Sequence, residues 1–372
     1  MFPPIGYLAW ARRFYGKVRY DLATSGVPWI DLPDADSPDG ARLPRDASAW
    51  DLFRDAIATY NGVPSQETVA ALGTTHAVWL AYASLASPGD EILVEEPVYE
   101  PLVAVAGGLG VRVRRFPRPQ AARFALDPGL IASAMSSRTR AVVVTNLHNP
   151  SGVRATDDEL RRAAAAAGEG QASLVVDEVY APFDGLVDPR GVFGRSARRL
   201  APNVVAVGSL TKCYGLGPER IGWMLGPPEV VKRAEDALTA TTGMLPLPHA
   251  RRGLRAFAMI EHLAQRARAV VAGKRDRVAR WVEEQGLSWS APSDGLFGFV
   301  SVPDAGDLTA LIESAASEYG VLVTPGAFFG APGGFRIAWS APEDDLKAGL
   351  TLLAQTLSSR RGNSPASARR KE

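Results

Sequence analysis

Short apolar runs alternate with alanine-rich, helix-forming stretches through the middle of this 372-residue chain. Each run has the length of one buried strand, and the stretches between the runs carry apolar residues at helical spacing. This alternation is typical of an α/β protein, in which helices cover a mostly parallel sheet. Strands are predicted at 91–94, 111–113, 141–144, 174–176 and 204–207, and helices at 49–60, 75–86, 156–167 and 229–240. Thr156 and Glu159 begin the third of these helices with a capping box.

The pattern changes after residue 245. A long, charged stretch of helical pattern runs from Pro246 to about Gln285, and strand-like pieces at 298–302, 321–324 and 335–338 precede a last helix at 343–357. We therefore expect a large domain (26–245), joined by a long helix to a small α+β domain (246–357). An N-terminal segment (1–25) is expected to lie over the ligand site. The tail (358–372) has no apolar residue beyond alanine and proline and is expected to be disordered.

Composition excludes several classes of protein. The 41 basic and 40 acidic residues leave a formal net charge of +1, so no nucleic-acid-binding or membrane-binding surface is expected. The single cysteine, Cys213, excludes an internal disulfide framework and argues against a cysteine-based metal cluster; no metal site is expected. The N-terminus has no signal-peptide pattern and no apolar run is long enough to span a bilayer. A cytoplasmic protein is therefore expected.

Lys212 is the most informative single residue. It follows the predicted strand at 204–207, after Ser209 and Thr211, and a glycine-rich stretch leads on to Arg220. Only six lysines occur in the chain, and an unpaired ammonium beside a buried strand is costly. The amine could form a Schiff base, while the hydroxyls and the guanidinium could hold a phosphate. The structural alternative is a strand-end lysine that reaches solvent.

Asp177 supplies an acid that can act together with Lys212. It ends the predicted strand at 174–176, 35 residues upstream of the lysine. The carboxyl ends of neighbouring parallel strands form the ligand-binding edge of an open α/β sheet. Pyridoxal phosphate needs both a lysine for covalent attachment and an acidic partner for its pyridine nitrogen. Lys212 and Asp177 therefore predict a pyridoxal phosphate site.

Further motifs follow the other strands. Gly73, Thr74 and Thr75 open a helix, where exposed amides and the helix dipole favour a phosphate. Tyr99 offers an aromatic face, and Asn149 is restricted by the proline that follows it. Each motif alone has a structural alternative: helix capping, packing or a polar turn.

Taken together and in this order, the motifs resemble those of the fold-type I pyridoxal-phosphate enzymes, specifically the class I/II aminotransferases. The resemblance covers residues 25–355 and rests on seven motifs: Gly73-x-x-x-Ala77, Pro97-x-Tyr99, Asn149-Pro150-x-Gly152, Asp177-x-x-Tyr180, Ser209-x-Thr211-Lys212, Arg220-x-Gly222 and Arg336 in a late short strand. It implies a large, mostly parallel-sheet domain with a smaller α+β domain, and a homodimer. It also implies an enzyme that moves an amino group between an α-amino acid and a 2-oxo acid.

The resemblance implies a role for each of these residues. Lys212 would bind the cofactor and move a proton at the substrate's α-carbon, with Asp177 on the pyridine nitrogen. Tyr99 would stack on the ring, while Asn149 and Tyr180 would bind its hydroxyl oxygen. The phosphate would be bound by Gly73, Thr74, Thr75, Ser209, Thr211 and Arg220. Arg336 would hold the substrate α-carboxylate through a two-pronged hydrogen bond, with Gly26 and Asn149 beside the substrate.

One departure and several alternatives remain. Family dimers commonly lend a tyrosine to the neighbour's phosphate, yet the stretch from Arg42 to Trp50 contains none. The same fold also catalyses elimination, decarboxylation, cyclisation or oxidative deamination, often in specialised metabolism, because the surrounding pocket chooses which bond breaks. The sensor half of a transcription regulator would need a helix-turn-helix module, for which the region before the motifs is too short. A Rossmann-type binder would need a Gly-x-Gly-x-x-Gly turn, which is missing.

Overall fold

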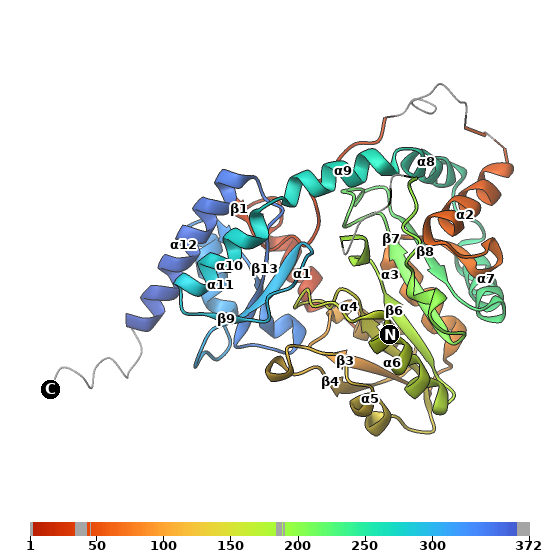
Figure 1. Ribbon diagram of the computed structural model, residues 1–372, viewed down its shortest axis with the longest axis horizontal. Helices are drawn as coiled ribbons and strands as arrows, with labels where there is room; N and C mark the ends of the chain where they lie inside the picture. The colour runs from red at the N-terminus through yellow and green to blue at the C-terminus, as the bar shows by residue number, and fades with distance from the viewer. Residues whose placement is uncertain (1–2, 34–42, 45, 184–187, 189, 363–372) are drawn as a thin grey trace.

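A seven-stranded sheet is the centre of the larger, right-hand part of the molecule in Figure 1, which shows a computed structural model. The description covers residues 3–33, 43–44, 46–183, 188 and 190–362. Parts of the predicted segments therefore lie outside the described residues: 1–2 of the N-terminal segment, 34–42, 45, 184–187 and 189 of the large domain, and 363–372 of the tail. The large-domain residues include 42 and 45 of the tyrosine-free stretch. The strands lie in the order β2-β8-β7-β6-β5-β3-β4; β8 is antiparallel to both β2 and β7, and the other adjacent pairs are parallel. Their bounds are β2 Thr68–Leu72, β3 Glu91–Glu96, β4 Arg112–Pro117, β5 Thr139–Thr145, β6 Ser173–Asp177, β7 Val204–Ser209 and β8 Ile221–Leu225.

Both faces of this sheet are buried under helices. Alternate residues of the central strands enter two separate apolar cores: Val143 and Val175 pack on one side, and Val142 and Val176 on the other. Central parallel strands therefore appear as continuous apolar runs in the sequence. The covering helices are α2 Ser48–Asn61, α3 Gly73–Leu85, α4 Glu100–Gly108, α5 Pro128–Ala134, α6 Asp157–Glu169 and α7 Pro228–Thr242. The predicted α/β fold is confirmed.

A second, smaller group of elements lies beside the sheet, at the left of Figure 1. Its antiparallel sheet has the order β12-β13-β10-β9, with a separate parallel pair of β1 and β11. The strands are β1 Tyr20–Asp21, β9 Ser288–Trp289, β10 Phe297–Ser301, β11 Val321–Leu322, β12 Thr324–Pro325 and β13 Gly334–Ala338, and the helices are α1 Gly6–Phe14, α10 Lys274–Glu284, α11 Thr309–Glu318 and α12 Glu343–Gly362. Trp10 and Phe14 of α1 belong to the apolar core of this group.

The stretch predicted as one long helix between Pro246 and Gln285 is instead three helices. These are α8 Leu247–Ala258, α9 Ile260–Val271 and α10. The first break falls at Met259 and the second at Gly273, which has a φ of +72° that side-chain-bearing residues rarely adopt. Buried residues of α8 and α9 pack with the large-sheet side, whereas those of α10 pack with the small group. The predicted division after residue 245 stays a prediction.

The strands β1, β2, β8 and β9 and the helices α1, α4, α5 and α11 were not among the predicted elements. The last helix, predicted to end at residue 357, continues to Gly362. No helix in the described part of the chain is both long and apolar enough to cross a membrane.

Candidate active site

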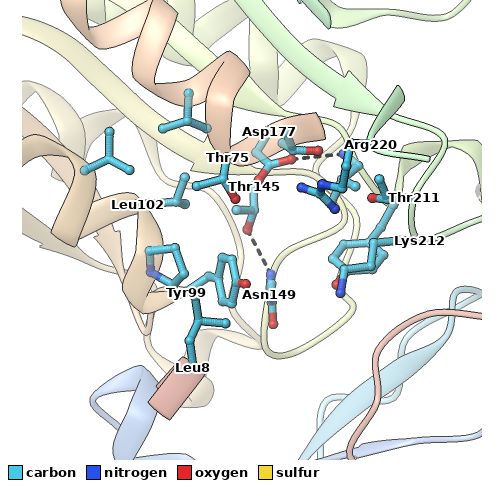
Figure 2. A pocket seen from close by; sticks show the side chains of 16 residues that line it. Leu8, Thr75, Tyr99, Leu102, Thr145, Asn149, Asp177, Thr211, Lys212 and Arg220 are labelled. Atoms are coloured by element: carbon cyan, nitrogen blue, oxygen red, sulfur yellow. Dashed lines mark hydrogen bonds between the residues drawn. The ribbon is translucent and has the colours of Figure 1, made fainter. Parts of the chain in front are cut away.

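A pocket of about 260 Å³ lies at the carboxyl ends of β5, β6 and β7 (Figure 2). Nine predicted residues line it: Thr74, Thr75, Tyr99, Asn149, Asp177, Tyr180, Thr211, Lys212 and Arg220. Seven further residues complete the lining: Leu8, Val78, Pro101, Leu102, Val105, Thr145 and Val179. The predicted residues that do not line it, Gly26, Gly73, Ser209 and Arg336, contact lining residues directly.

Lys212 is held at the pocket by its backbone, while its amine has no hydrogen bond or ion pair among the described residues. The carbonyl of Lys212 accepts a hydrogen bond from Val27 N–H at 2.9 Å. A Cβ on Gly26 would lie 3.5 Å from the lysine Cδ, so the N-terminal segment passes within van der Waals contact of this side chain. Burial lowers the pKa of Lys212, and the positive charges of Arg336 and Arg220 act in the same direction. A larger fraction of this amine is therefore unprotonated near neutral pH, and so able to act as a nucleophile or accept a proton, than of an ordinary lysine.

Asp177 ends β6 and is buried. One carboxylate oxygen accepts a hydrogen bond from Val179 N–H at 3.0 Å. Burial, with a smaller contribution from the negative charge of Glu95, raises the pKa of Asp177 to about 7. A cation placed against this carboxylate would restore its ionised form.

Hydroxyl groups and a guanidinium gather at the start of α3. Thr74 Oγ1 donates to Ser209 Oγ at 2.8 Å, and Ser209 Oγ lies 2.7 Å from Thr211 Oγ1. Gly73 has a φ of +75°, and a Cβ there would collide with the guanidinium of Arg220. The glycine thus allows the arginine to lie over the helix N-terminus. Hydroxyls, a cation and exposed helix amides together suit a phosphate group.

Tyr180 and Asn149 border the space between these groups. Tyr180 Oη lies 2.7 Å from Ser25 Oγ, which connects the N-terminal segment to the turn that follows β6. Asn149 N–H donates to Thr145 Oγ1 at 2.8 Å, as the dashed line in Figure 2 shows. Thr145 in turn donates to the buried Glu95 at 2.5 Å. Asn149 is therefore positioned through a chain of hydrogen bonds that begins at a buried carboxylate.

Arg336 is a fully buried cation with no acidic partner among the described residues. Its Nη1 donates to Asn149 Oδ1 at 2.9 Å, and its Nη2 donates to the carbonyl of Ala23 at 3.0 Å and to Tyr7 Oη at 3.2 Å. Its Nε has no hydrogen-bond partner in the described part of the chain. Because a buried charge is costly without a counter-ion, the arrangement indicates that an anion binds here.

Sequence reasoning missed Tyr7 and Leu8, both on α1. The ring of Tyr7 meets that of Tyr99 edge to face, with centroids 5.6 Å apart, and Leu8 lines the pocket. Apolar residues at positions 7, 10 and 14 have helical spacing, so the helix was detectable in the sequence. Its contact with Arg336, more than 300 residues away, had no local signal.

The donors present fit pyridoxal phosphate. One pocket is surrounded by the amine of Lys212, which has no partner among the described residues, by a buried carboxyl with a raised pKa, and by a cluster of hydroxyls and a guanidinium suited to a phosphate. Each matches one functional group of that cofactor: the aldehyde, the pyridine nitrogen and the phosphate.

Comparison with known proteins gives a consistent result. The family model described as "Aminotransferase class I and II" matches residues 45–352. The chain is 29% identical to capreomycidine synthase of Streptomyces vinaceus, over 94% of this chain and 92% of that protein. It is 28% identical to a probable aspartate/prephenate aminotransferase of Thermus aquaticus, over 90% of both. The crystal structure of a PLP-dependent cyclase, OrfR, superposes with a TM-score of 0.81 at 26% identity, covering 96% of this chain and 98% of that one.

Proposed function

The chain belongs to the class I and II aminotransferases, pyridoxal-phosphate-dependent enzymes, and from this premise we propose that it moves an amino group between an α-amino acid and a 2-oxo acid. Arg336 carries the proposal. A buried guanidinium with no acidic counter-ion among the described residues shares one site with Lys212, and an α-carboxylate would supply the missing charge. A substrate held there would bring its amino nitrogen to the lysine.

When bound, pyridoxal phosphate supplies an aldehyde that joins covalently to amines and a ring that withdraws electrons from the bonds at the substrate α-carbon. Lys212 Nζ would anchor it and then remove and return the α-proton, a task that the lowered pKa of this lysine favours. Asp177 would hold a proton on the pyridine nitrogen. Tyr99 would stack on the ring, and Asn149 and Tyr180 would orient it. Gly73, Thr74, Thr75, Ser209, Thr211 and Arg220 would bind the phosphate.

The second candidate is another reaction of the same fold on an amino acid, with cyclisation first among elimination, decarboxylation and oxidative deamination. The likeness to a PLP-dependent cyclase along almost the whole chain favours it. The groups that hold the cofactor and the carboxylate serve both reactions, so the bond that breaks depends on the rest of the pocket.

A half-reaction separates the two candidates. Holoenzyme mixed with excess amino acid, and no 2-oxo acid, should release one 2-oxo acid per site and stop, with the cofactor recovered in its amine form. Added 2-oxo acid should restart turnover, giving ping-pong kinetics. Lys212→Ala should abolish both steps and the visible absorption of the lysine-bound cofactor. Continuous release of ammonia, carbon dioxide or a cyclised product, or consumption of oxygen, would instead support the second candidate.

We further propose that the enzyme acts as a homodimer in the cytoplasm. Two large apolar side chains, Trp29 and Met244, are 72% and 60% exposed in the single chain, which favours a partner surface. Light scattering of the holoenzyme at micromolar concentration tests this; a monomeric mass would contradict it.

A further inference from the structure

We propose that the amino acid accepted by this site has an uncharged, apolar side chain, recognised by Leu8 on α1 together with Pro101, Leu102 and Val105 on α4. This inference rests on the proposed function, because it concerns the side chain of the same amino acid. It adds the substrate class, which the cofactor and carboxylate groups leave open.

The charges in the pocket are all at one side. Among the described lining residues only Asp177, Lys212 and Arg220 are charged, and each is assigned above to the cofactor. Figure 2 shows Leu8, Tyr99 and Leu102 across the pocket from Thr211, Lys212 and Arg220. The lining on that far side is made of apolar side chains and one aromatic ring. A charged substrate side chain placed there would find no counter-ion among the described lining residues.

Glu100 is the acidic residue nearest to this apolar wall in the sequence, and its carboxylate is already engaged. Gly6 N–H donates to Oε1 at 2.8 Å, and Tyr7 N–H donates to Oε2 at 2.6 Å. Both oxygens therefore hold the first turn of α1, where they also complement the helix dipole. An ammonium or guanidinium side chain of a substrate would have to share this carboxylate with the two helix amides.

The position of α1 links the wall to the carboxylate site. Tyr7 Oη accepts a hydrogen bond from Arg336 Nη2 at 3.2 Å, and Leu8 is the next residue along the helix. If the α-amino nitrogen points to Lys212 and the α-carboxylate to Arg336, the side chain of the amino acid faces the rest of the pocket lining. That lining contains Leu8 and Leu102.

Kinetics over a panel of amino acids test this inference. Leucine, methionine and phenylalanine should exceed aspartate, glutamate, arginine and lysine in kcat/KM by roughly 100-fold or more, because each buried methylene contributes about 10- to 200-fold and an unpaired charge opposes binding. Leu8→Lys, at a partly exposed position, should lower kcat/KM for leucine and raise it for glutamate by about 10-fold or more. Leu130→Lys, at a similarly exposed leucine on α5 outside the pocket, is the matched control and should change neither value.

The outcomes separate the inference from the proposed function. If amino acids are transaminated but an acidic or basic one is preferred by the wild-type enzyme, the apolar assignment is overturned while transamination stands. If Leu8→Lys folds, by circular dichroism, and leaves the ranking unchanged, Leu8 is not a recognition residue. If no amino acid in the panel yields a 2-oxo acid, the proposed function itself fails.

Discussion

The sequence indicated where some residues of the site lie but not where others lie. Lys212, Asp177 and Asn149 follow apolar runs, so their place at the carboxyl edge of the sheet could be predicted from local pattern. Arg336 was predicted through its motif. Tyr7 was not, because a tyrosine on an N-terminal helix carries no local sign that it will meet a guanidinium at the other end of the chain. Tertiary contacts of this kind arise only when the two groups of elements pack together.

Arg336→Lys should raise KM for every α-amino acid by roughly 10- to 100-fold. Lysine keeps the charge but loses the planar fork that can bind a carboxylate with two parallel hydrogen bonds, and charge-assisted bonds are worth about 1.5–3 kcal/mol. The turnover number should fall as well, because Nη1 also holds Asn149. Steady-state kinetics measure both values. Arg13→Lys, at a surface ion pair with Glu313, is the control; an unchanged KM in Arg336→Lys would move the carboxylate site elsewhere.

Among the helices and strands, the central parallel strands were predicted and the β2–β8 pair at one edge was not. The β2 sequence, Thr-Val-Ala-Ala-Leu, has few β-branched residues, and β8 contains Gly222. That glycine is required by the fold, since a Cβ there would lie 2.6 Å from Gly73 Cα. A close approach between two backbones thus explains a glycine that weakens the strand pattern.

The capping box predicted at Thr156 and Glu159 is confirmed because it depends only on neighbouring residues.

Glu100→Ala should loosen α1. The substitution leaves the N–H groups of Gly6 and Tyr7 without their carboxylate acceptor, at a cost of about 1–3 kcal/mol. Hydrogen exchange of the amides in Gly6–Phe14 should accelerate, and KM should rise because Tyr7 and Leu8 are carried by this helix. Glu100→Gln, which keeps one acceptor oxygen, should show a smaller effect. Unchanged exchange in Glu100→Ala would mean that packing of Trp10 and Phe14 alone holds the helix.

For the molecule as a whole, the pocket lies where the large sheet meets the smaller group of elements, and the N-terminal segment contacts both. Ser25 binds Tyr180 on the large-sheet side, Gly26 accepts from Ser340 on the other, and Arg336 reaches across to Asn149. Polar groups buried at this junction, Asp177 above all, are costly until a ligand satisfies them. Cofactor binding should therefore stabilise the entire fold, and its effect should depend on pH.

The direction of that dependence follows from Asp177. Its pKa is about 7 in the structure against 3.8 ordinarily, so the folded apoprotein keeps a proton that the unfolded chain has lost, and apoprotein stability falls as pH rises from about 4 to about 7.

A ring cation beside the ionised carboxylate removes this cost above pH 7. Since one pKa unit corresponds to about 1.4 kcal/mol, pyridoxal phosphate should raise the melting temperature by several degrees more at pH 8 than at pH 5. Glu178 also has a pKa raised to about 7, mainly by burial and to a smaller extent by the negative charge of Asp177. Its bonds to Ser196 and Ala197 do not involve the pocket, so most of its contribution cancels between apo- and holoprotein. Scanning calorimetry of wild type and Asp177→Asn at both pH values decides the matter: an Asp177→Asn protein with the wild-type pH difference would show that the carboxylate is not the group that responds to the cofactor.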